Sequence, residues 1–471
     1  MNRIKLLLPI IFLLFVFSCR TKKEEPLEKP NVLFLIVDDL RTALGTYNYP
    51  DVISPNIDQL ASEGVRFDRS YCNVPVCGAS RASFLTGFRP HFPDRFNNYY
   101  THVEEDAPEA LTLPRHFRNN GYIAISNGKV FHHQYDKAED WSESPWKPDT
   151  TSLIDFSNVS WMDSASLDKM NPETGAGPYF EGADAPDSLY FDAKLAKKTI
   201  SDLKRLAKQD KPFFLSVGFH KPHLPFNAPK KYYDLYDTIQ IAENRFRPEG
   251  LPDEVRNSRE IFVYGYLDHY NSLEFHYEAR HAYYACVSFI DTQVGRIMNE
   301  LESQGLDKNT IVVLIGDHGW HLGEHNFWGK HNVLHNALNT PMIIKAPGVE
   351  TGVSDKIVEF VDLYPTLCDL AGIELPGHLH GSSMKGILTG NDDDWENMAF
   401  CEWKGARTVI TDQYSYSKWP YVKNRNVQLL FDHSVDPNEN INVVNEEKYS
   451  EVVKSHSRMI DSLYAEFWPE E

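Results

Sequence analysis

The sequence is poor in cysteine and in basic residues. Only six of its 471 residues are cysteines, which excludes a small disulfide-stapled scaffold and leaves stability to a hydrophobic core. Lysine and arginine together number 47 against 67 aspartate and glutamate residues, so the net charge is −20. Non-specific nucleic-acid binding needs a basic surface, and we therefore expect no nucleic-acid partner. No sequence signal pairs the four cysteines outside the motifs described below, which are Cys72, Cys286, Cys368 and Cys401.

The sequence also lacks a hydrophobic run long enough to cross a bilayer. The apolar run at residues 6–17 is shorter than the roughly 20 residues of a spanning helix, but it has the length of a signal-peptide core. A serine then precedes Cys19, as in a bacterial lipobox, and a charged stretch follows. We expect residues 1–18 to be a signal peptide, Cys19 to carry a lipid that anchors the protein to a membrane, and residues 19–30 to be a tether. The predicted product is an exported bacterial lipoprotein in the periplasm or on the cell surface.

Two continuous apolar runs end in residues of metal-binding type. They span residues 31–37 and 310–315 and are rich in β-branched residues, which predicts buried parallel strands. The polar residues that follow them are Asp38, Asp39, Asp317 and His318. The carboxyl ends of parallel strands meet at one edge of an open sheet, where ligands bind. The sequence thus predicts an oxygen-rich site for one divalent cation. Ca²⁺ is the preferred ion and Mg²⁺ the alternative.

Amphipathic helices alternate with these strands. Apolar residues recur at helical spacing near residues 192–208 and 275–303, which predicts helices with one buried face. A shorter helix is predicted at residues 56–63, with Ser54 as its N-cap. Alternating strands and helices predict an α/β fold for residues 31–390, an α/β/α sandwich around a mostly parallel sheet.

The composition changes after residue 390. Short runs typical of strands, and one amphipathic segment typical of a helix, lie at residues 408–411, 414–416, 428–431 and 449–467. Short strands close together in sequence favour antiparallel pairing. We therefore predict a small antiparallel α+β subdomain over residues 391–471.

The most informative segment is CGASRASFLTG at residues 77–87. Taken alone, a cysteine in a loop of small residues is also compatible with a buried, inert thiol. Six further blocks accompany it, namely NVLFLIVDD (31–39), SPNIDQLASEGVRF (54–67), GYIAISNGKVFHH (121–133), VGFHKPHLPF (217–226), DTQVGR (291–296) and GDHGWHLGEHNFWGK (316–330). With these blocks the sequence resembles the type I sulfatases of the alkaline phosphatase superfamily over roughly residues 31–445. Within that family it looks most like the iduronate 2-sulfatases and bacterial uronate 2-O-sulfatases.

The resemblance implies a modified nucleophile at Cys77. In the family this cysteine is oxidised to Cα-formylglycine by a maturase, and the hydrated aldehyde attacks the sulfate ester. Family members more often have proline where Ala79 stands, and alanine is compatible with an anaerobic radical-type maturase. The metal ligands that the resemblance implies are Asp38, Asp39, Cys77, Asp317 and His318.

The resemblance also implies roles for five charged or basic residues. Sulfuryl transfer places negative charge on oxygen atoms, so the site needs fixed cations and an acid for the leaving alcohol. Arg81 would hold the hydrate, and Lys129 and Lys330 would bind the sulfate. His132 would take a proton from the sulfated hydrate, and His220 would protonate the leaving oxygen. The match assigns no role to five nearby histidines, which are His133, His223, His321, His325 and His331.

The expected function is hydrolysis of a carbohydrate sulfate ester. The branch resemblance points to the 2-O-sulfate of an unsaturated or saturated uronic acid in glycosaminoglycan oligosaccharides. One alternative is a phosphodiesterase or phosphonate monoester hydrolase of the same superfamily, because formylglycine occurs there too. Another is a lipid-anchored glycan-binding protein with a dead site, although no motif residue is missing from the sequence.

Overall fold

The computed structural model describes the whole chain except residues 1–28, 50, 150–151, 155–159, 423–425 and 469–471. The predicted signal peptide and Cys19 lie outside the described residues. Among the described residues, no helix combines the length and the apolar character that a membrane span requires. The five cysteines that the structure describes are all buried free thiols.

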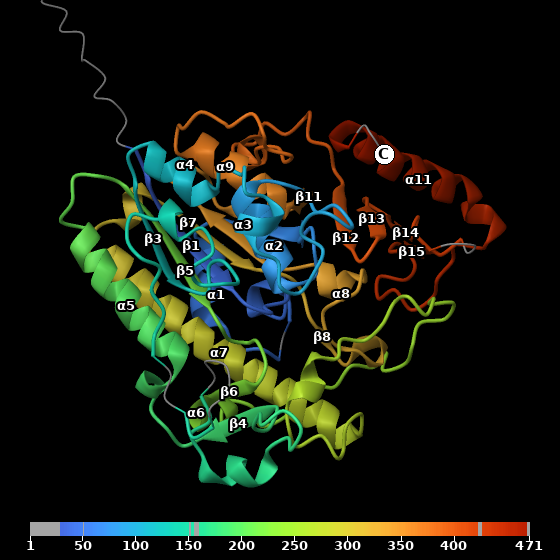
Figure 1. Ribbon diagram of the computed structural model, residues 1–471, viewed down its shortest axis with the longest axis horizontal. Coiled ribbons are helices and arrows are strands. Elements are labelled where there is room, and N and C mark those ends of the chain that lie inside the picture. The colour runs from blue at the N-terminus through green and yellow to red at the C-terminus, as the bar shows by residue number, and fades with distance from the viewer. Residues whose placement is uncertain (1–28, 50, 150–151, 155–159, 423–425, 469–471) are drawn as a thin grey trace, which may run out of the picture.

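A seven-stranded sheet forms the centre of the protein (Figure 1). Its strands are β1 (Asn31–Val37), β2 (Val65–Tyr71), β3 (Ile123–Gly128), β5 (Phe213–Phe219), β7 (Thr310–Gly316), β10 (Met342–Lys345) and β11 (Gly352–Glu359). They lie in the order β11-β2-β10-β7-β1-β5-β3. β1 pairs in parallel with both β5 and β7, and β10 runs antiparallel to both of its neighbours. The prediction of a mostly parallel sheet, with strands after both apolar runs, is confirmed.

Helices cover both faces of this sheet (Figure 1). On one face lie α1 (Pro55–Ser62), α5 (Phe191–Leu206) and α7 (Leu273–Ser303); on the other lie α2 (Cys77–Thr86), α4 (Leu113–Asn119) and α9 (Leu363–Leu370). Alternate side chains of β1 join different cores, with Phe34 packed on the side of α2 and Leu35 on the side of α7. Because both faces of the strand are buried, its sequence is apolar at every position rather than at every second one. The predicted α/β/α sandwich is confirmed.

The start of α1 differs from the prediction. Ser54 makes no capping hydrogen bond to the helix, and its hydroxyl instead donates to Asp58 Oδ1 at 3.1 Å. The backbone N–H groups of Asn56 and Ile57 donate to Oδ1 of Asp291, at 2.9 and 2.8 Å. A carboxylate from α7 therefore caps α1 from the neighbouring helix, and a negative charge at that end also suits the helix dipole.

The C-terminal subdomain is a four-stranded antiparallel sheet covered by one helix. Its elements are β12 (Ala399–Trp403), β13 (Ala406–Ile410), β14 (Tyr414–Lys418), β15 (Gln428–Asp432) and α11 (Ser450–Phe467). The prediction is confirmed, and β12 is a strand that the sequence did not indicate. The backbone N–H of Glu402 in β12 donates to the carbonyl of Asn73 at 2.8 Å. The subdomain is thereby attached to the segment that leads into α2.

The remaining helices and strands are short. They are α3 (Val103–Asp106), α6 (Lys230–Tyr233), α8 (His335–Leu338), α10 (Lys385–Leu388), β4 (Phe180–Ala183), β6 (Phe226–Pro229), β8 (His321–Leu322) and β9 (Trp328–Gly329). The boundary proposed from the sequence, between residues 390 and 391, falls between α10 and β12.

Candidate active site

The carboxyl ends of β1 and β7 bring three carboxylates together. The two strands pair so that Val37 lies opposite Gly316. The residues that follow are Asp38, Asp39 and Asp317, all buried. Asp39 has a φ of 60°, so the chain turns sharply as it leaves the strand, and its backbone N–H donates to Asp317 Oδ1 at 3.0 Å. The backbone thus locks two of the acids that the sequence predicted as metal ligands into one cluster.

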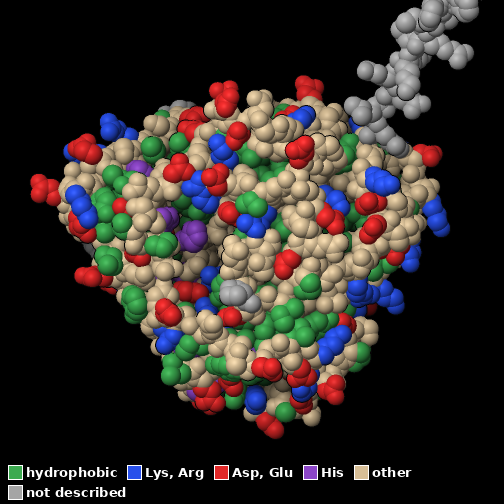
Figure 2. All heavy atoms as spheres, turned by 180° about the vertical axis from the view of Figure 1, so that it is seen from behind, with side chains coloured by type: hydrophobic (Ala, Val, Ile, Leu, Met, Phe, Trp, Pro, Cys, Tyr) green, Lys and Arg blue, Asp and Glu red, His purple; other side chains and the backbone are tan. Residues whose placement is uncertain are grey.

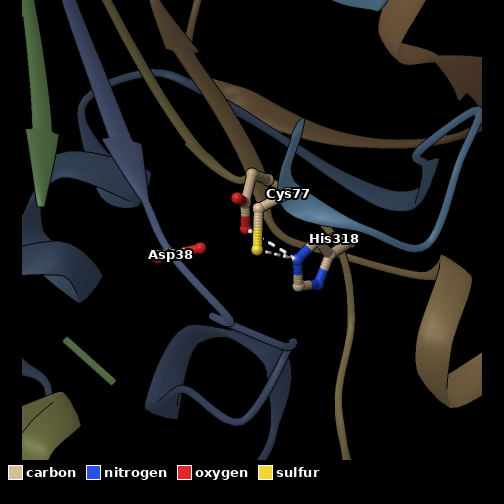
Figure 3. Close-up of side chains that lie close together, drawn as sticks. Asp38, Cys77 and His318 are labelled. Carbon is tan, nitrogen blue, oxygen red and sulfur yellow. Dashed lines mark hydrogen bonds and ion pairs between the residues drawn. The ribbon is translucent and has the colours of Figure 1, made fainter. Parts of the chain in front are cut away.

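Cys77 faces this cluster from the first turn of α2. Its Sγ lies 3.2 Å from Nε2 of His318. One ligand-type atom from each of Asp38, Cys77, Asp317 and His318 lies within 4.8 Å of all the others. Figure 3 shows Asp38, Cys77 and His318 directed toward one another. The N-terminus of a helix carries partial positive charge, so α2 presents Cys77 in a setting that favours anions.

Lone pairs converge at the centre of this cluster. Nδ1 of His318 lies 3.0 Å from the carbonyl oxygen of Gly319; a carbonyl only accepts, so Nδ1 carries the hydrogen and Nε2 presents a lone pair. That nitrogen is 3.4 Å from Asp39 Oδ1. Among the described residues, Asp38 Oδ1 and Asp39 Oδ2 are buried without a hydrogen-bond partner. Buried anionic oxygens without donors are costly, and carboxylates with one imidazole nitrogen fit a divalent cation.

Three fixed cations surround the carboxylates. Lys129 pairs with Asp38, Lys330 Nζ lies 2.7 Å from Asp39 Oδ1, and Arg81 Nε lies 2.9 Å from Asp317 Oδ2. Burial by itself raises the pKa of Asp38, but Lys129 and the other neighbouring cations lower it overall, well below its usual value. Burial likewise lowers the pKa of Lys330, and the surrounding anions raise it overall, well above its usual value. At Asp39, burial outweighs the nearby Lys330 and raises the pKa of the carboxyl overall. The low pKa of Asp38 and the high pKa of Lys330 keep these two groups charged at neutral pH although water is excluded.

His132 and His220 lie beside the cluster with one ring nitrogen free. A Cβ added to Gly78 would lie 3.6 Å from the ring of His132, which places this ring next to Cys77. Burial and then Lys129 lower the pKa of His132 to about 2, and burial, followed by neighbouring cations, lowers the pKa of His220 well below its usual value. Among the described residues, His132 Nδ1 and His220 Nε2 have no hydrogen-bond partner. Both rings are neutral in the free site.

The structure adds His223 and Glu260 to the site. Nε2 of His223 lies 2.8 Å from Glu260 Oε1, and Oε2 of Glu260 lies 2.9 Å from Lys330 Nζ. A ligand atom of His223 also lies within 4.8 Å of those of Asp39 and Cys77. Burial lowers the pKa of His223, but Asp39 and Glu260 raise it overall. His223 belongs to the VGFHKPHLPF block, so the sequence drew attention to it without giving it a role. Glu260, in the short 3-10 segment Glu260–Val263, belongs to no motif.

The other four nearby histidines have partners away from the carboxylates. His321 Nε2 lies 3.2 Å from Asn332 Oδ1, His325 Nε2 lies 2.7 Å from the carbonyl of Asn438, His331 Nδ1 lies 2.9 Å from Ser258 Oγ, and the ring of His133 stacks on His102. On the face shown in Figure 2, histidine side chains gather beside a hollow that also exposes acidic and basic side chains. His133, His321, His325 and His331 are outside the cluster of candidate ligands.

Comparison with known proteins agrees with this geometry. The chain matches the model of the family named Sulfatase over residues 30–373. This chain belongs to the sulfatase family. The sulfatase is thus a sulfuric ester hydrolase of the alkaline phosphatase superfamily, and the resemblance seen in the sequence is confirmed. A second match, to the C-terminal region named N-sulphoglucosamine sulphohydrolase, covers residues 323–466.

Individual relatives share different parts of this sulfatase. It is 33% identical to the iduronate 2-sulfatase of Homo sapiens over 390 residues, which are 74% of this chain and 70% of that protein. It is 26% identical to the Delta 4,5-hexuronate-2-O-sulfatase of Bacteroides thetaiotaomicron over 465 residues, 92% of this chain and 88% of that protein. The solved structure of a phosphonate monoester hydrolase from Silicibacter pomeroyi matches with a TM-score of 0.76 at 24% identity, over 94% of this chain and 96% of that chain. The similarity to the phosphonate monoester hydrolase shows a shared fold.

Proposed function

We propose that this sulfatase removes the 2-O-sulfate of a uronic acid in glycosaminoglycan oligosaccharides, through a formylglycine made from Cys77. The observation that carries the proposal is the position of Cys77 at a helix N-terminus, beside a carboxylate cluster and inside a ring of fixed cations. Two relatives named for iduronate and hexuronate 2-O-sulfate chemistry support the choice of substrate. These two relatives also support a broader form of the proposal, in which the substrates are glycosaminoglycan sulfates in general.

The charge of the site suits a monoanionic ester. Four carboxylates, Asp38, Asp39, Asp317 and Glu260, face three fixed cations, Arg81, Lys129 and Lys330. Counted as ionised, these seven groups carry one net negative charge, and a bound divalent cation would turn it into one net positive charge. A sulfate monoester carries one negative charge and would neutralise the loaded site. We propose Asp38, Asp39, Asp317 and His318, with an oxygen at residue 77, as the ligands of a Ca²⁺ ion.

An unmodified Cys77 would be a weak nucleophile. Burial raises the pKa of its thiol well above the usual value, and the thiolate is the reactive form. A hydrated formylglycine places two hydroxyl groups at this position, and Sγ marks the place of one of those oxygens. The cation, when bound, supplies positive charge that favours ionisation of a neighbouring hydroxyl and offsets charge on the sulfuryl oxygens.

The proposed reaction has two bond-breaking steps. First, a hydroxyl oxygen of residue 77, having lost its proton to solvent, attacks sulfur, the bond from sulfur to the sugar oxygen breaks, and a protonated His220 gives that oxygen a proton. Then His132 takes the proton of the second hydroxyl, the bond from the carbon of residue 77 to the sulfated oxygen breaks, the aldehyde reforms, and sulfate leaves as a dianion. Water rehydrates the aldehyde, so one water is consumed for each ester. An anionic ester bound beside His220 would raise the pKa of this ring, which burial and then the neighbouring cations lower in the free site.

The cations would hold the reacting groups in place. Arg81 lies between the carbonyl of Val130, an acceptor at 3.1 Å, and Asp317, so its guanidinium is fixed against the first turn of α2. Lys129 and Lys330 directly follow β3 and β9 and approach the carboxylates from there. Each ammonium would transfer part of its pairing to the sulfate oxygens when the ester binds.

We also propose that the protein is exported and anchored by a lipid on Cys19. The signal-peptide and lipobox pattern supports this proposal. A maturase acting on Cys77 before folding is part of the same proposal, because the folded chain buries this residue to 3% exposure. Mass spectrometry of membrane-extracted protein would test the lipid: a diacylglyceryl N-terminus at residue 19 is expected, and an unmodified N-terminus at another residue would contradict it.

The central experiment combines peptide mass and sulfate release. Protein produced with a formylglycine-generating maturase is digested, and the peptide containing residue 77 is expected to be about 18 Da lighter than the cysteine form. The same protein should release inorganic sulfate from an unsaturated 2-O-sulfated uronate disaccharide. Cys77→Ala should abolish release, and Cys286→Ala, which removes another buried free thiol, should retain it.

The outcomes separate the alternatives. A formylglycine peptide with faster hydrolysis of a phosphonate monoester than of any sulfate ester would favour phosphonate hydrolysis, the reaction named for the fold relative. Sulfate release from other sulfated sugars alone would reject the uronate. Unmodified Cys77 in a maturase-equipped host, with full activity, would reject the mechanism.

A further inference from the structure

A cavity of about 430 Å³ lies next to the catalytic cluster, between the 254–259 loop and the C-terminal subdomain. We name it the Trp403 pocket after the residue at the end of β12. The wall residues that matter here are Tyr99, Ser258, His331, Trp403 and Lys404. None of these belongs to the cluster of candidate ligands or to the cations that face it.

The Trp403 pocket adjoins the sulfate site directly. His331 follows Lys330 in the chain, and its backbone N–H donates to the carbonyl of Pro75 at 3.3 Å, just before α2. A Cβ added to Gly78 would lie 3.2 Å from the carbonyl oxygen of Tyr99. The segments that line the Trp403 pocket and the first turn of α2, which carries Cys77, are therefore direct neighbours.

Three rings form the floor of the pocket and a lysine lies over them. The ring of His331 stacks on Trp403, with centroids 5.6 Å apart and an interplanar angle of 20°. Tyr99 meets both rings edge-on, at 4.7 and 5.4 Å. Nζ of Lys404 lies 4.5 Å from the centroid of Tyr99, 5.2 Å from that of Trp403, and donates to the Tyr99 hydroxyl at 3.1 Å. The ammonium is thus held at a fixed point by cation–π contacts and one hydrogen bond.

The pocket is positive in a protein whose net charge is −20. Among the described residues that line it, Arg256, Arg259 and Lys404 carry positive charge and Glu254 carries negative charge. An apolar floor with a few convergent polar groups is the usual composition of a small-molecule site. The excess of cations selects anionic ligands.

Lys404 occupies a backbone position that disfavours lysine. It forms, with Gly405, the two-residue turn between β12 and β13, in which Trp403 pairs with Ala406. Both turn residues have positive φ, 47° for Lys404 and 78° for Gly405. Such turns favour Asn or Gly at the first position, because a longer side chain is strained there. A strained lysine at the mouth of a binding pocket indicates a role in function rather than in stability.

We propose that the Trp403 pocket binds the part of the substrate beyond the reacting sulfate, and that Lys404 pairs with an oxyanion there. This inference rests on the proposed function, because it takes the substrate to be an acidic sulfated oligosaccharide. The oxyanion is the carboxylate of the sulfated uronate or a sulfate on the adjoining sugar. Lys404 is then a specificity-determining residue that does not take part in the chemical step.

The test measures binding without turnover. The Cys77→Ala protein is titrated calorimetrically with an unsaturated 2-O-sulfated uronate linked to 6-O-sulfated N-acetylglucosamine, and then with the same disaccharide lacking the 6-O-sulfate. Adding Lys404→Asn should weaken binding of the first ligand about tenfold, as expected for loss of one charge-assisted hydrogen bond. Binding of inorganic sulfate should not change. Lys454→Gln, which removes an exposed lysine of α11, is the matched control and should retain full affinity.

The two disaccharides identify the oxyanion. If the effect of Lys404→Asn persists without the 6-O-sulfate, Lys404 pairs with the uronate carboxylate; if it disappears, Lys404 pairs with the sulfate of the second sugar. Asparagine suits the turn, so the melting temperature should stay the same or rise, and a loss of affinity then cannot come from misfolding. Unchanged affinity for both disaccharides, or no binding of either by the Cys77→Ala parent, overturns the proposal. Binding by this parent without sulfate release by the wild type would contradict only the proposed function.

Discussion

Gly218 in β5 controls the position of Lys129, and replacing it should disable the site. Gly218 lies opposite Gly128 in the sheet, and its carbonyl accepts the backbone N–H of Lys129 at 2.8 Å. A Cβ on Gly218 would lie 1.8 Å from the carbonyl oxygen of Lys129, whereas an ordinary contact begins at 3.4 Å. Gly218→Ala must therefore move this backbone by about 1.6 Å.

The displacement acts on two of the proposed catalytic groups at once. The same carbonyl of Lys129 accepts a hydrogen bond from Arg81, so both cations lose their positions. A misplacement of about 1 Å can cost on the order of 100-fold in rate, and we expect kcat/KM to fall by at least that factor. Overpacking a buried strand costs about 1–3 kcal/mol in the free energy of unfolding.

The assay is sulfate release from the 2-O-sulfated uronate disaccharide, with the formylglycine content of each preparation measured by peptide mass. Urea unfolding gives the stability of the same samples. Gly352→Ala is the control, because a Cβ at this position of β11 meets nothing within 4 Å. If Gly218→Ala folds with full formylglycine content and keeps wild-type kcat/KM, the assignment of Lys129 to the reaction is wrong.

Three further predictions concern the cation, one helix cap and one arginine. Chelation should lower the melting temperature and Ca²⁺ should restore it, since a ligand at 100 times its Kd stabilises by about 2.7 kcal/mol; an unchanged melting temperature would argue against the cation site. Burial raises the pKa of Asp291 to about 6 from 3.8, so between these pH values the native state holds a proton that the unfolded state lacks. The wild type should therefore gain stability relative to Asp291→Asn as the pH falls from 7 to 5. Urea unfolding at each pH measures this difference, and a constant value would contradict the predicted ionisation. Arg81→Lys keeps the positive charge but loses the planar guanidinium, which donates to both Asp317 and the carbonyl of Val130, so kcat/KM should fall about 100-fold or more. Wild-type kinetics would show that this two-sided hydrogen bonding is not needed.

The sequence predicted the strand ends and named most of the candidate site residues because each depends on local order. Continuous apolar runs become strands buried on both faces, and the acids that follow must then emerge at the carboxyl edge of the sheet. Asp38, Asp39 and Asp317 follow this logic. The motif blocks added Cys77 and His220, whose places at the start of α2 and after β5 are also set by neighbouring sequence.

Other features depend on pairings between distant segments, which local patterns do not encode. The cap of α1 is such a case: Ser54 is the local candidate, but Asp291, far away in the chain, takes the two N–H groups. Glu260 is another, since a single glutamate in a loop gives no signal until Lys330 and His223 lie beside it.

The sequence by itself determined the fold class, the family and most of the candidate site residues, because these follow from periodicity and from motifs of fixed spacing. The tertiary structure alone decided the order of the strands, the pairing of each cation with its carboxylate, and the meeting of Tyr99, His331 and Trp403 under Lys404. The physical reason is that buried charges and stacked rings gain their energy from neighbours in space. Those neighbours come from distant segments, 91 residues apart for Asp38 and Lys129 and 305 for Tyr99 and Lys404, and only the packing of the sheet, its helices and the C-terminal subdomain brings them together.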